Sequence, residues 1–448
     1  MDPNVASMTE TVPSIEFESA EGTQDWRVLA HGVDAWFLAP SFSDGAALVA
    51  AVADAGLADS GQQDGRPAPV RIEARVRRNG VRLMLRHTSP GLPASIVGTA
   101  RRISGLAAAA GLRADPTVLS DVQLAIDVVD TAAVVPFWGL ALGYEQVGDD
   151  DLVDPLRRNP PVWIQGSGTA RPLRNRIHID VSRPGLAVEQ TRRALVVASA
   201  STAFGGPFGV CLADGEGNEI DVVPPSDDWD ERPELSDWVL MFGAMTHYPV
   251  ESDQAAAELA VQAAAIADAA RVELLIDVRP EGVTFDSAKD GWEIDERFAN
   301  MAAQLQAAAR AQGLVADPAP LRFVQIGIDA LDIDRVRDFW RAVLGYVDDP
   351  RRALGVTDIV DPLRWGPPVF FQDFEGDAAR RAQRNRTHID LYVPRDQAEV
   401  RIAAALAAGG RVVRDKEAPY WVTIADPEGN ELDVAVITGR ESVWGTEG

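Results

Sequence analysis

The stretch Val122-Gln123-Leu124-Ala125-Ile126-Asp127 recurs about 200 residues later as Val324-Gln325-Ile326-Gly327-Ile328-Asp329. Four further stretches return in the same order. Phe137-Trp138 returns as Phe339-Trp340, and Val153-Asp154-Pro155-Leu156-Arg157 returns as Val360-Asp361-Pro362-Leu363-Arg364. His178-Ile179-Asp180 returns as His388-Ile389-Asp390, and Glu216-Gly217-Asn218-Glu219 returns as Glu428-Gly429-Asn430-Glu431. The offset between the copies drifts only from 202 to 212 residues. One long collinear repeat of this kind predicts tandem domains, because solenoid repeats are roughly 20–50 residues long.

Each copy divides into two segments, which we name A and B. The sequences Ala114-Asp115-Pro116 and Ala316-Asp317-Pro318 separate them, because proline disfavours a helical conformation in the residue before it. We expect a disordered tail at 1–22, A segments at 23–116 and 234–318, and B segments at 117–226 and 319–440.

Composition narrows the class of protein and its partners. A hydrophobic content of 46% with 25% charged residues is typical of a globular protein with several cores. The net charge of −26 disfavours nucleic acid and anionic membranes as partners, because binding them needs clustered lysine and arginine. The single cysteine, Cys211, excludes an intrachain disulfide. Without an apolar signal-peptide region at 1–11 or a long apolar run, the expected location is cytoplasmic.

The A segments show a helix, hairpin, helix pattern. In the first copy we expect helices at 45–56 and 94–110 around a hairpin of 70–78 and 81–87, whose Asn79-Gly80 turn is a strong two-residue hairpin signal. In the second copy the expected elements are a helix at 254–270, a hairpin of 272–279 and 283–285, and a helix at 293–312.

The B segments show strands with alternating polar and apolar residues. The first B segment predicts strands at 121–129, 162–165, 177–181, 209–212 and 219–223, with helices at 131–142 and 187–198. Because residues i and i+2 of a strand share a face, Gln123 and Asp127 lie opposite the apolar side chains, and His178 lies with Asp180. If each B segment forms a cupped sheet, these polar faces converge into one pocket per copy.

The B segments resemble the vicinal oxygen chelate superfamily, in a glyoxalase-like subgroup. The resemblance rests on the strand ending in Asp, the Phe-Trp helix followed by Leu-Gly-Tyr, and the closing Glu-Gly-Asn-Glu-Leu-Asp of the second copy. It implies a paired βαβββ fold and places an unidentified divalent metal among the expected cofactors. The metal-ligand positions that it implies are Gln123, Gln165, His178 and Asp221 in the first copy and Gln325, Gln372, His388 and Asp433 in the second.

Other polar and aromatic residues of the same stretches supply candidate catalytic and binding groups. A carboxylate can move a proton during the reaction, and the candidates are Asp127, Asp180, Asp329 and Asp390. Each B segment also offers an aromatic wall and an arginine for an anionic group. These substrate-binding candidates are Trp163, Arg157, Phe370 and Arg364. For the two arginines, a salt bridge to Asp154 or Asp361 is the structural alternative.

The A segments resemble the pterin-4a-carbinolamine dehydratase fold, an α-β-β-α unit, in pattern more than in motif. The His-His-Pro cluster of that family is absent from both segments, so packing or dimerisation is the favoured role. The expected fold class is α+β, a tandem duplication of an α-β-β-α dehydratase-like domain followed by a paired βαβββ domain.

Two classes of function remain open. The leading one is a small-molecule enzyme of the vicinal oxygen chelate type, a metal-assisted lyase or isomerase acting on an oxygen-rich metabolite. The alternative is a metal-free protein that binds or sequesters a small molecule, as in antibiotic resistance. A pterin carbinolamine dehydratase is the third and least favoured. The chain is expected to be a pseudo-dimer by itself, with a homodimer left open.

Overall fold

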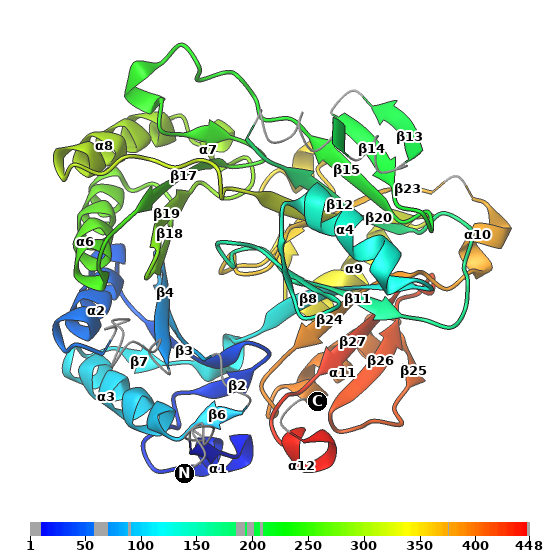
Figure 1. Cartoon of the computed structure of the whole chain (residues 1–448), viewed down its shortest axis with the longest axis horizontal. Helices are drawn as coiled ribbons and strands as arrows, with labels where there is room; N and C mark the ends of the chain where they lie inside the picture. Colours follow the sequence, from blue (N-terminus) through cyan, green and yellow to red (C-terminus); the bar gives the residue numbers. More distant parts are fainter. Residues whose placement is uncertain are drawn as a thin grey trace, which may run out of the picture.

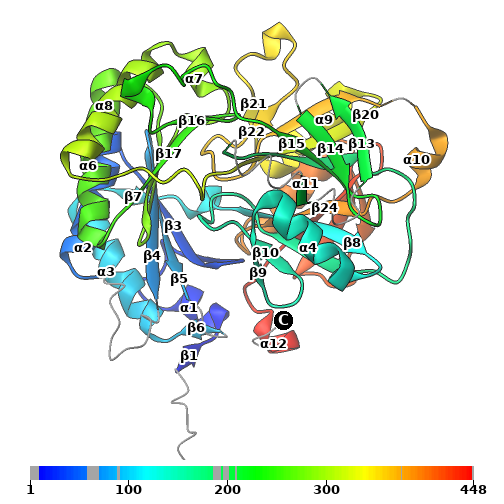
Figure 2. The ribbon, with the colours of Figure 1, turned by 45° about the horizontal axis from the view of Figure 1, so that its top comes forward.

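A computed structural model describes residues 10–445 of the chain, apart from 58–69, 88–90, 185–192, 195–200, 207–208 and 375. Within these residues the chain forms three large β-sheets and one two-stranded ribbon. The sheet of the A segments lies on one side of the molecule and the two sheets of the B segments lie on the other (Figures 1 and 2). No helix among the described residues is long and apolar enough to cross a membrane.

The two A segments share one continuous sheet. Its strands, in spatial order, are β16 (Val239–Leu240), β17 (Ala244–Pro249), β19 (Gly282–Asp286), β18 (Leu275–Arg279), β4 (Arg71–Arg77), β5 (Gly80–Arg86), β3 (Gly32–Leu38) and β2 (Arg27–Leu29), with β7 (Arg113–Ala114) paired to β3. The copies meet where β4 pairs antiparallel with β18. Arg75 there lies opposite Asp277, its own counterpart in the repeat. The two copies are therefore related by a pseudo-twofold axis at this point.

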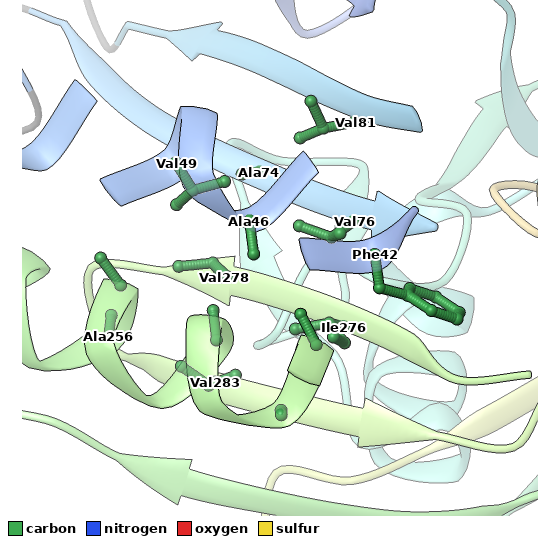
Figure 3. Close-up of a cluster of buried hydrophobic side chains, with 14 of the residues drawn as sticks. Phe42, Ala46, Val49, Ala74, Val76, Val81, Ala256, Ile276, Val278 and Val283 are labelled. Atoms are coloured by element: carbon green, nitrogen blue, oxygen red, sulfur yellow. The ribbon is translucent and has the colours of Figure 1, made fainter. Parts of the chain in front are cut away.

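Four long helices cover the outer face of this sheet: α2 (Phe42–Asp54), α3 (Ser95–Ala109), α6 (Asp253–Ala270) and α8 (Arg297–Ala311) (Figure 1). Helices α2 and α6 come from different copies and pack together over β4 and β18 (Figure 3). Small side chains, such as Ala46 of α2 and Ala256 of α6, let the two helices approach closely. The A segments therefore share one hydrophobic core.

Each B-segment sheet combines strands of both copies. In the first, the order is β25 (Arg411–Arg414), β26 (Trp421–Ala425), β27 (Glu431–Ala435), β24 (Thr387–Tyr392), β8 (Asp121–Val128), β11 (Val162–Gly166), β10 (Asp151–Val153) and β9 (Glu145–Val147). In the second it is β13 (Ser201–Gly206), β14 (Gly209–Ala213), β15 (Glu219–Val223), β12 (Ile177–Ser182), β20 (Phe323–Ala330), β23 (Val369–Asp373), β22 (Ile359–Val360) and β21 (Val347–Asp348). The expectation of one cup within each copy is therefore wrong. Each sheet joins the first half of one B segment to the second half of the other.

The apolar faces of these two sheets meet in a single core. Ile126, Ile179, Ile328 and Ile389, one from each central strand, are fully buried in it. The helices α4 (Thr131–Leu142), α9 (Ile333–Leu344) and α11 (Ala398–Ala407) belong to the same half. Residues of opposite copies pair directly here, so the duplicated chain buries a continuous core that neither B segment holds alone.

Most predicted elements of the A segments are confirmed, with differences at their ends. The hairpin of β4 and β5 turns at Asn79-Gly80, as the dipeptide predicts. Helix α2 begins three residues earlier than expected, because the Ser41 hydroxyl accepts the backbone N–H of Asp44 and caps it. The pattern did not reveal that strands precede the first helix of each A segment, β2 and β3 in one copy and β16 and β17 in the other. The expected helix at 293–312 is divided into α7 (Gly291–Ile294) and α8.

Part of the predicted disordered tail is ordered. Residues 10–22 contain β1 (Thr11–Val12), which pairs with β6 (Leu92–Pro93), and α1 (Ser14–Ser19). Phe17 of α1 is fully buried in the A-segment core, and this burial explains the order. Ser14 also binds the carboxylate of Glu441 at the start of α12 (Glu441–Trp444), so the first and the last described helices are in contact. Most of the predicted helix at 187–198 lies outside the described residues.

The remaining short elements connect these units. They are α10 (Ala378–Ala382) and the 3-10 turns at Pro116–Val118, Pro233–Leu235 and Arg352–Leu354.

Candidate functional site

Strands β12 and β20 bring polar side chains of the two copies together. The apolar residues of β12, Ile179 among them, enter the B-segment core, so the alternation leaves His178 and Asp180 on the opposite face. Antiparallel pairing with β20 sets Asp180 opposite Gln325. On the other side of β12, parallel pairing sets Asp180 beside Asp221 of β15.

We name the resulting group centre 1: His178, Asp180 and Asp221 from the first copy and Gln325 from the second. The Nε2 atom of His178 lies 3.5 Å from Oδ1 of Asp180. One potential ligand atom each from His178, Asp180 and Asp221 lies within 4.8 Å of the other two. The Gln325 amide donates to Oδ2 of Asp180 over 2.8 Å, which leaves its carbonyl oxygen available.

Centre 2 is the counterpart with the copies exchanged: His388, Asp390 and Asp433 from the second copy and Gln123 from the first. His388 Nε2 lies 3.6 Å from Asp390 Oδ1, and the same 4.8 Å limit holds for the His, Asp and Asp ligand atoms. Strand pairing sets Asp390 opposite Gln123. Here the glutamine oxygen already accepts the Tyr392 hydroxyl over 2.9 Å, and this distinguishes centre 2 from centre 1.

Unpartnered oxygen atoms mark both centres. Among the described residues, Oδ1 of Asp180, Oδ1 of Asp221 and Oε1 of Gln325 are buried without a hydrogen-bond donor. In centre 2 the same holds for Oδ1 of Asp390 and Oδ1 of Asp433. Leaving a buried acceptor unpaired costs about 1–3 kcal/mol, and more for a charged group. Carboxylate and amide oxygens beside an imidazole are ligands for a divalent cation, so the residues present fit a metal.

Burial and like charge raise the pKa of one carboxyl in each centre. Desolvation raises the pKa of Asp180 to about 6, and the nearby carboxylate of Asp221 acts in the same direction. The pKa of Asp390 is likewise raised to about 6 by desolvation and by Asp433. The histidine of each centre lowers the pKa of the carboxyl, but by less than burial raises it.

Centre 1 is enclosed by an aromatic ring and a close glycine. The Phe370 ring packs edge-on against the His178 ring, with 5.6 Å between the centroids. Gly327 lies opposite His178 in the strand pairing, and a Cβ atom on it would lie only 2.2 Å from Cε1 of His178. The imidazole therefore occupies space that only glycine leaves free. Lys289 of the second A segment lies 5.6 Å from the Phe370 ring centre.

Centre 2 has a different wall. The strand position equivalent to Phe370 is Trp163, whose indole N–H donates to Asp150 over 3.0 Å. The Arg440 guanidinium lies 5.6 Å from the Tyr392 ring and 5.4 Å from the Trp421 ring. The predicted aromatic walls, Trp163 and Phe370, are thus level with the histidines, but their polar surroundings differ between the two centres.

The structure does not bring the other predicted ligands and bases into the centres. Asp127 and Asp329, at the strand ends, form ion pairs with Arg171 and Arg380 respectively. By strand register Gln165 lies beside Asp127 and Gln372 beside Asp329, two residues along from the level of the histidines. The Gln372 amide donates to Asp329 over 2.7 Å. Asp180 and Asp390, predicted as proton carriers, do lie in the centres, two residues after the histidine on the same strand.

Arg157 and Arg364 lie in the turns that precede β11 and β23, and neither belongs to the His, Asp and Asp groups of the centres. Neither ion pair predicted as the structural alternative forms: Asp154 and Asp361 instead accept backbone N–H groups of their own turns. Both arginines have a left-handed backbone, with φ of 48° and 57°. Arg157 is exposed at the surface, whereas Arg364 faces the A-segment sheet.

Some residues near the centres gave no usable signal in the sequence. Lys289 and Arg440 lie outside the repeated motifs and reach the centres only through tertiary structure. Tyr392 follows His388 at i+4 on the same strand, and this spacing places it on the histidine face. That alternation was available from the sequence and was missed.

Comparison with known families identifies the B segments. The family described as Glyoxalase-like domain matches residues 123–223 and 325–435. The chain therefore contains two glyoxalase-like domains, and the resemblance inferred from the repeated motifs is confirmed for the B segments. No curated protein sequence matches the chain.

Several solved structures are similar to the chain at low identity. A mutant of glyoxalase I from Zea mays is 9% identical, with a TM-score of 0.37, and the match covers 71% of this chain and 94% of that one. A putative dioxygenase from Bacillus subtilis is 10% identical, with a TM-score of 0.34, over 70% and 84% of the two chains. The cppA protein from Streptococcus pneumoniae is 8% identical, with a TM-score of 0.31, over 71% and 97%.

Proposed function

We propose that this protein, with its two glyoxalase-like domains, is a metal-dependent small-molecule enzyme of the vicinal oxygen chelate type. It acts as a lyase or isomerase on an oxygen-rich metabolite. One observation carries the proposal. Both centres present buried, unpartnered carboxylate oxygens beside a histidine, and each centre draws its residues from both copies of the repeat.

The two centres offer a metal the same types of ligand, and they differ in whether the glutamine oxygen already accepts a hydrogen bond. In centre 1 they are His178, Asp221 and Gln325, with the second carboxylate, Asp180, within reach. In centre 2 they are the counterparts, of which Gln123 is already hydrogen-bonded to Tyr392. When bound there, a divalent ion would supply Lewis acidity towards a substrate oxygen.

The remaining groups of each centre bind the substrate and move protons. Asp180 and Asp390 hold or transfer a proton at Oδ1, because a pKa of about 6 suits exchange near neutral pH. Phe370 and Trp163 form an apolar wall that orients a planar substrate and excludes water. Lys289 lies beside this wall at centre 1, and its ammonium group, which also pairs with Asp358, is the cation nearest an anionic substrate there.

The metal content of the purified protein tests the proposal directly. We expect about two divalent ions per chain in the wild type, measured by mass spectrometry of the metals after loading and desalting. His178→Ala or His388→Ala should each remove about one ion, and the double variant both, because imidazole is the one nitrogen ligand of each group.

A buried histidine outside the centres provides the control. His247→Gln should keep both ions, because His247 lies in β17 and its Nδ1 atom bonds to Thr284 over 2.9 Å. A wild-type protein that takes up no divalent ion from solution contradicts the enzyme proposal. That result favours metal-free binding of a small molecule by the same two pockets.

For the A segments we propose a packing role. Their strands form one sheet across both copies and their helices share one core, an arrangement that fixes the two B segments relative to each other. A pterin dehydratase needs histidines as acid and base. In the second A segment His247 is buried against Thr284, and we expect no dehydration of a pterin carbinolamine by the purified protein.

A further inference from the structure

A cavity lies between the A-segment sheet and the turns that carry Arg157 and Arg364. Its empty volume is about 560 Å3, with the open mouth included. It reaches the pseudo-twofold axis, where Arg75 lies opposite Asp277 in the antiparallel register of β4 and β18. Neither candidate metal centre contributes its histidine or its carboxylates to the lining.

Positive charge exceeds negative charge in the lining of this cavity. Five cationic side chains line it: Arg75, Arg158, Lys289, Arg322 and Arg364. The lining contains three carboxylates. The protein as a whole has a net charge of −26, so the excess of positive side chains in this cavity is opposite in sign to the net charge of the chain.

The three carboxylates already have partners. Asp277 accepts from Arg77 over 3.0 Å and from Arg158 over 2.7 Å. Asp286 accepts from Arg158 over 2.6 Å. Asp361 accepts backbone N–H groups of its own turn over 2.8–2.9 Å. Arg158 thus forms ion pairs with two of the carboxylates, and backbone N–H groups bind the third.

Three of the arginines make no direct ion pair, although the carboxylates of Asp277, Asp154 and Asp361 lie near enough to act on the pKa values of Arg75, Arg322 and Arg364, respectively. Within the described part of the chain, Arg75, Arg322 and Arg364 form no ion pair. Arg75 is only 8% exposed, donates to two backbone carbonyl oxygens, and has a buried Nε–H without an acceptor. Burial lowers the pKa of the Arg75 guanidinium to about 9. Burial also lowers the pKa values of Arg322 and Arg364.

The repeat explains why the space is open. The counterpart of Arg158 in the second copy is Trp365, whose indole packs against Trp36 with 5.3 Å between the ring centres and fills its side of the axis. The counterpart of Asp277 is the cation Arg75. The two copies therefore differ at the axis: one places a guanidinium where the other has an indole ring, and one places a cation where the other has a carboxylate.

We propose that this cavity binds a small oxyanion, either a phosphate group or a carboxylate, through the guanidinium groups of Arg75 and Arg364. Guanidinium N–H groups bind both oxyanions in bidentate fashion, so one site chemistry serves either. An anion here neutralises cations that the protein leaves unpaired, and it joins the A-segment sheet to the turn of the second B segment. The site contains none of the proposed metal ligands, although Lys289 borders both the cavity and centre 1, and it does not depend on the proposed function of the metal centres.

Titration calorimetry on the full-length, chelator-treated protein tests this proposal. Chelation removes metal ions that would themselves bind phosphate. We expect saturable binding of inorganic phosphate, of succinate, or of both, and the stronger of the two identifies the ligand class. Arg364→Gln should weaken that binding by about tenfold or more, because one charged hydrogen-bond donor is lost.

The repeat supplies a matched control for this substitution. Arg157 is the counterpart of Arg364, with the same left-handed backbone, but it is exposed and does not line the cavity. Arg157→Gln should leave anion binding within about twofold of the wild type. The proposal is overturned if neither anion binds saturably, or if the two substitutions weaken binding equally, which would indicate general surface charge.

Thermal unfolding gives a second measurement that does not depend on calorimetry. The bound anion should raise the melting temperature of the wild type, because a ligand that binds only the folded state stabilises it. Arg364→Gln should remove this rise while leaving the anion-free protein at least as stable as the wild type, since an uncompensated buried charge is lost. An anion-free variant that is much less stable than the wild type contradicts the proposal.

Discussion

At the scale of single residues, the two copies differ at the position that faces each histidine. His178 of centre 1 faces Gly327, whereas His388 of centre 2 faces Ala125. A methyl group on Gly327 would lie 2.3 Å from His178 Nε2 and 2.7 Å from the Phe370 ring, so both rings would have to move. The glycine therefore fixes how the imidazole lies in centre 1.

Gly327→Ala tests this steric requirement. We expect the variant to fold and to bind metal at centre 1 about tenfold or more weakly, because displaced ligand geometry costs affinity. Centre 2 should be unchanged. Ala125→Gly is the control, since it removes a methyl group without displacing His388. Equal metal affinities of the variant and the wild type, measured by competition with a chelating dye, would show that the contact does not position the ligand.

A buried histidine outside the centres predicts how stability varies with pH. Burial lowers the pKa of His247 to about 4, below its ordinary value of about 6.5. Between these values the unfolded chain binds a proton that the folded protein does not. Stability is therefore complete above about pH 6.5 and decreases as the pH falls towards 4, by up to about 3 kcal/mol from this group.

His247→Gln should make stability less dependent on pH in this range. The difference in the free energy of unfolding between the wild type and the variant should shrink as the pH falls from 7 to 5. Urea unfolding at several pH values measures it. A difference that stays constant across that range contradicts the assignment.

At the scale of elements, arginines of one copy bind the closing turn of the other. The Arg176 side chain, only 1% exposed, donates to the Asn430 side chain over 2.9 Å. Arg386 makes the equivalent bond to Asn218 over 2.6 Å. The repeated Asn-Arg and Gly-Asn motifs are turn chemistry in the sequence. In the structure they also hold the two B-segment sheets together.

Asn430→Ala tests this contact between the copies. The substitution leaves the buried Nε–H of Arg176 without its acceptor, while the other guanidinium N–H groups keep their backbone acceptors, and it also removes a bond donated by Asn385 over 2.7 Å. We therefore expect a loss of about 3 kcal/mol in stability. Asn300→Ala, at an exposed position of α8, should change stability by less than about 0.5 kcal/mol. Thermal unfolding of both variants decides whether the buried turn stabilises the fold.

At the scale of the whole molecule, the assembly of each centre from both copies can be tested by pairing substitutions. His178→Ala with Gln325→Leu alters only centre 1, because Gln325 lies opposite Asp180. The combination should therefore keep about one metal ion per chain at unchanged affinity. His178→Ala with Gln123→Leu alters both centres, so the remaining ion should bind more weakly. Centres formed within single copies would give the reverse pattern.

The sequence predicted the histidines of the centres better than their complete surroundings. Repetition identified His178 and His388, and strand alternation placed Asp180 and Asp390 on the same faces. The first-strand glutamines were assigned to the centre of their own copy, whereas each belongs to the centre of the other. Lys289 and Arg440 could not be predicted, since nothing local indicates which distant side chains will face a sheet.

By itself, the sequence determined the duplication, the hairpins and the division of each strand into a polar and an apolar face. These follow from local rules, in which two-residue turns and a side-chain period of two decide the outcome. Only the tertiary structure decided that β12 pairs with β20 and β24 with β8. The paired strands of the two copies have nearly the same residues. Pairing within a copy and pairing between copies therefore satisfy the alternation of polar and apolar side chains equally well. The choice between them depends on burial of the shared core.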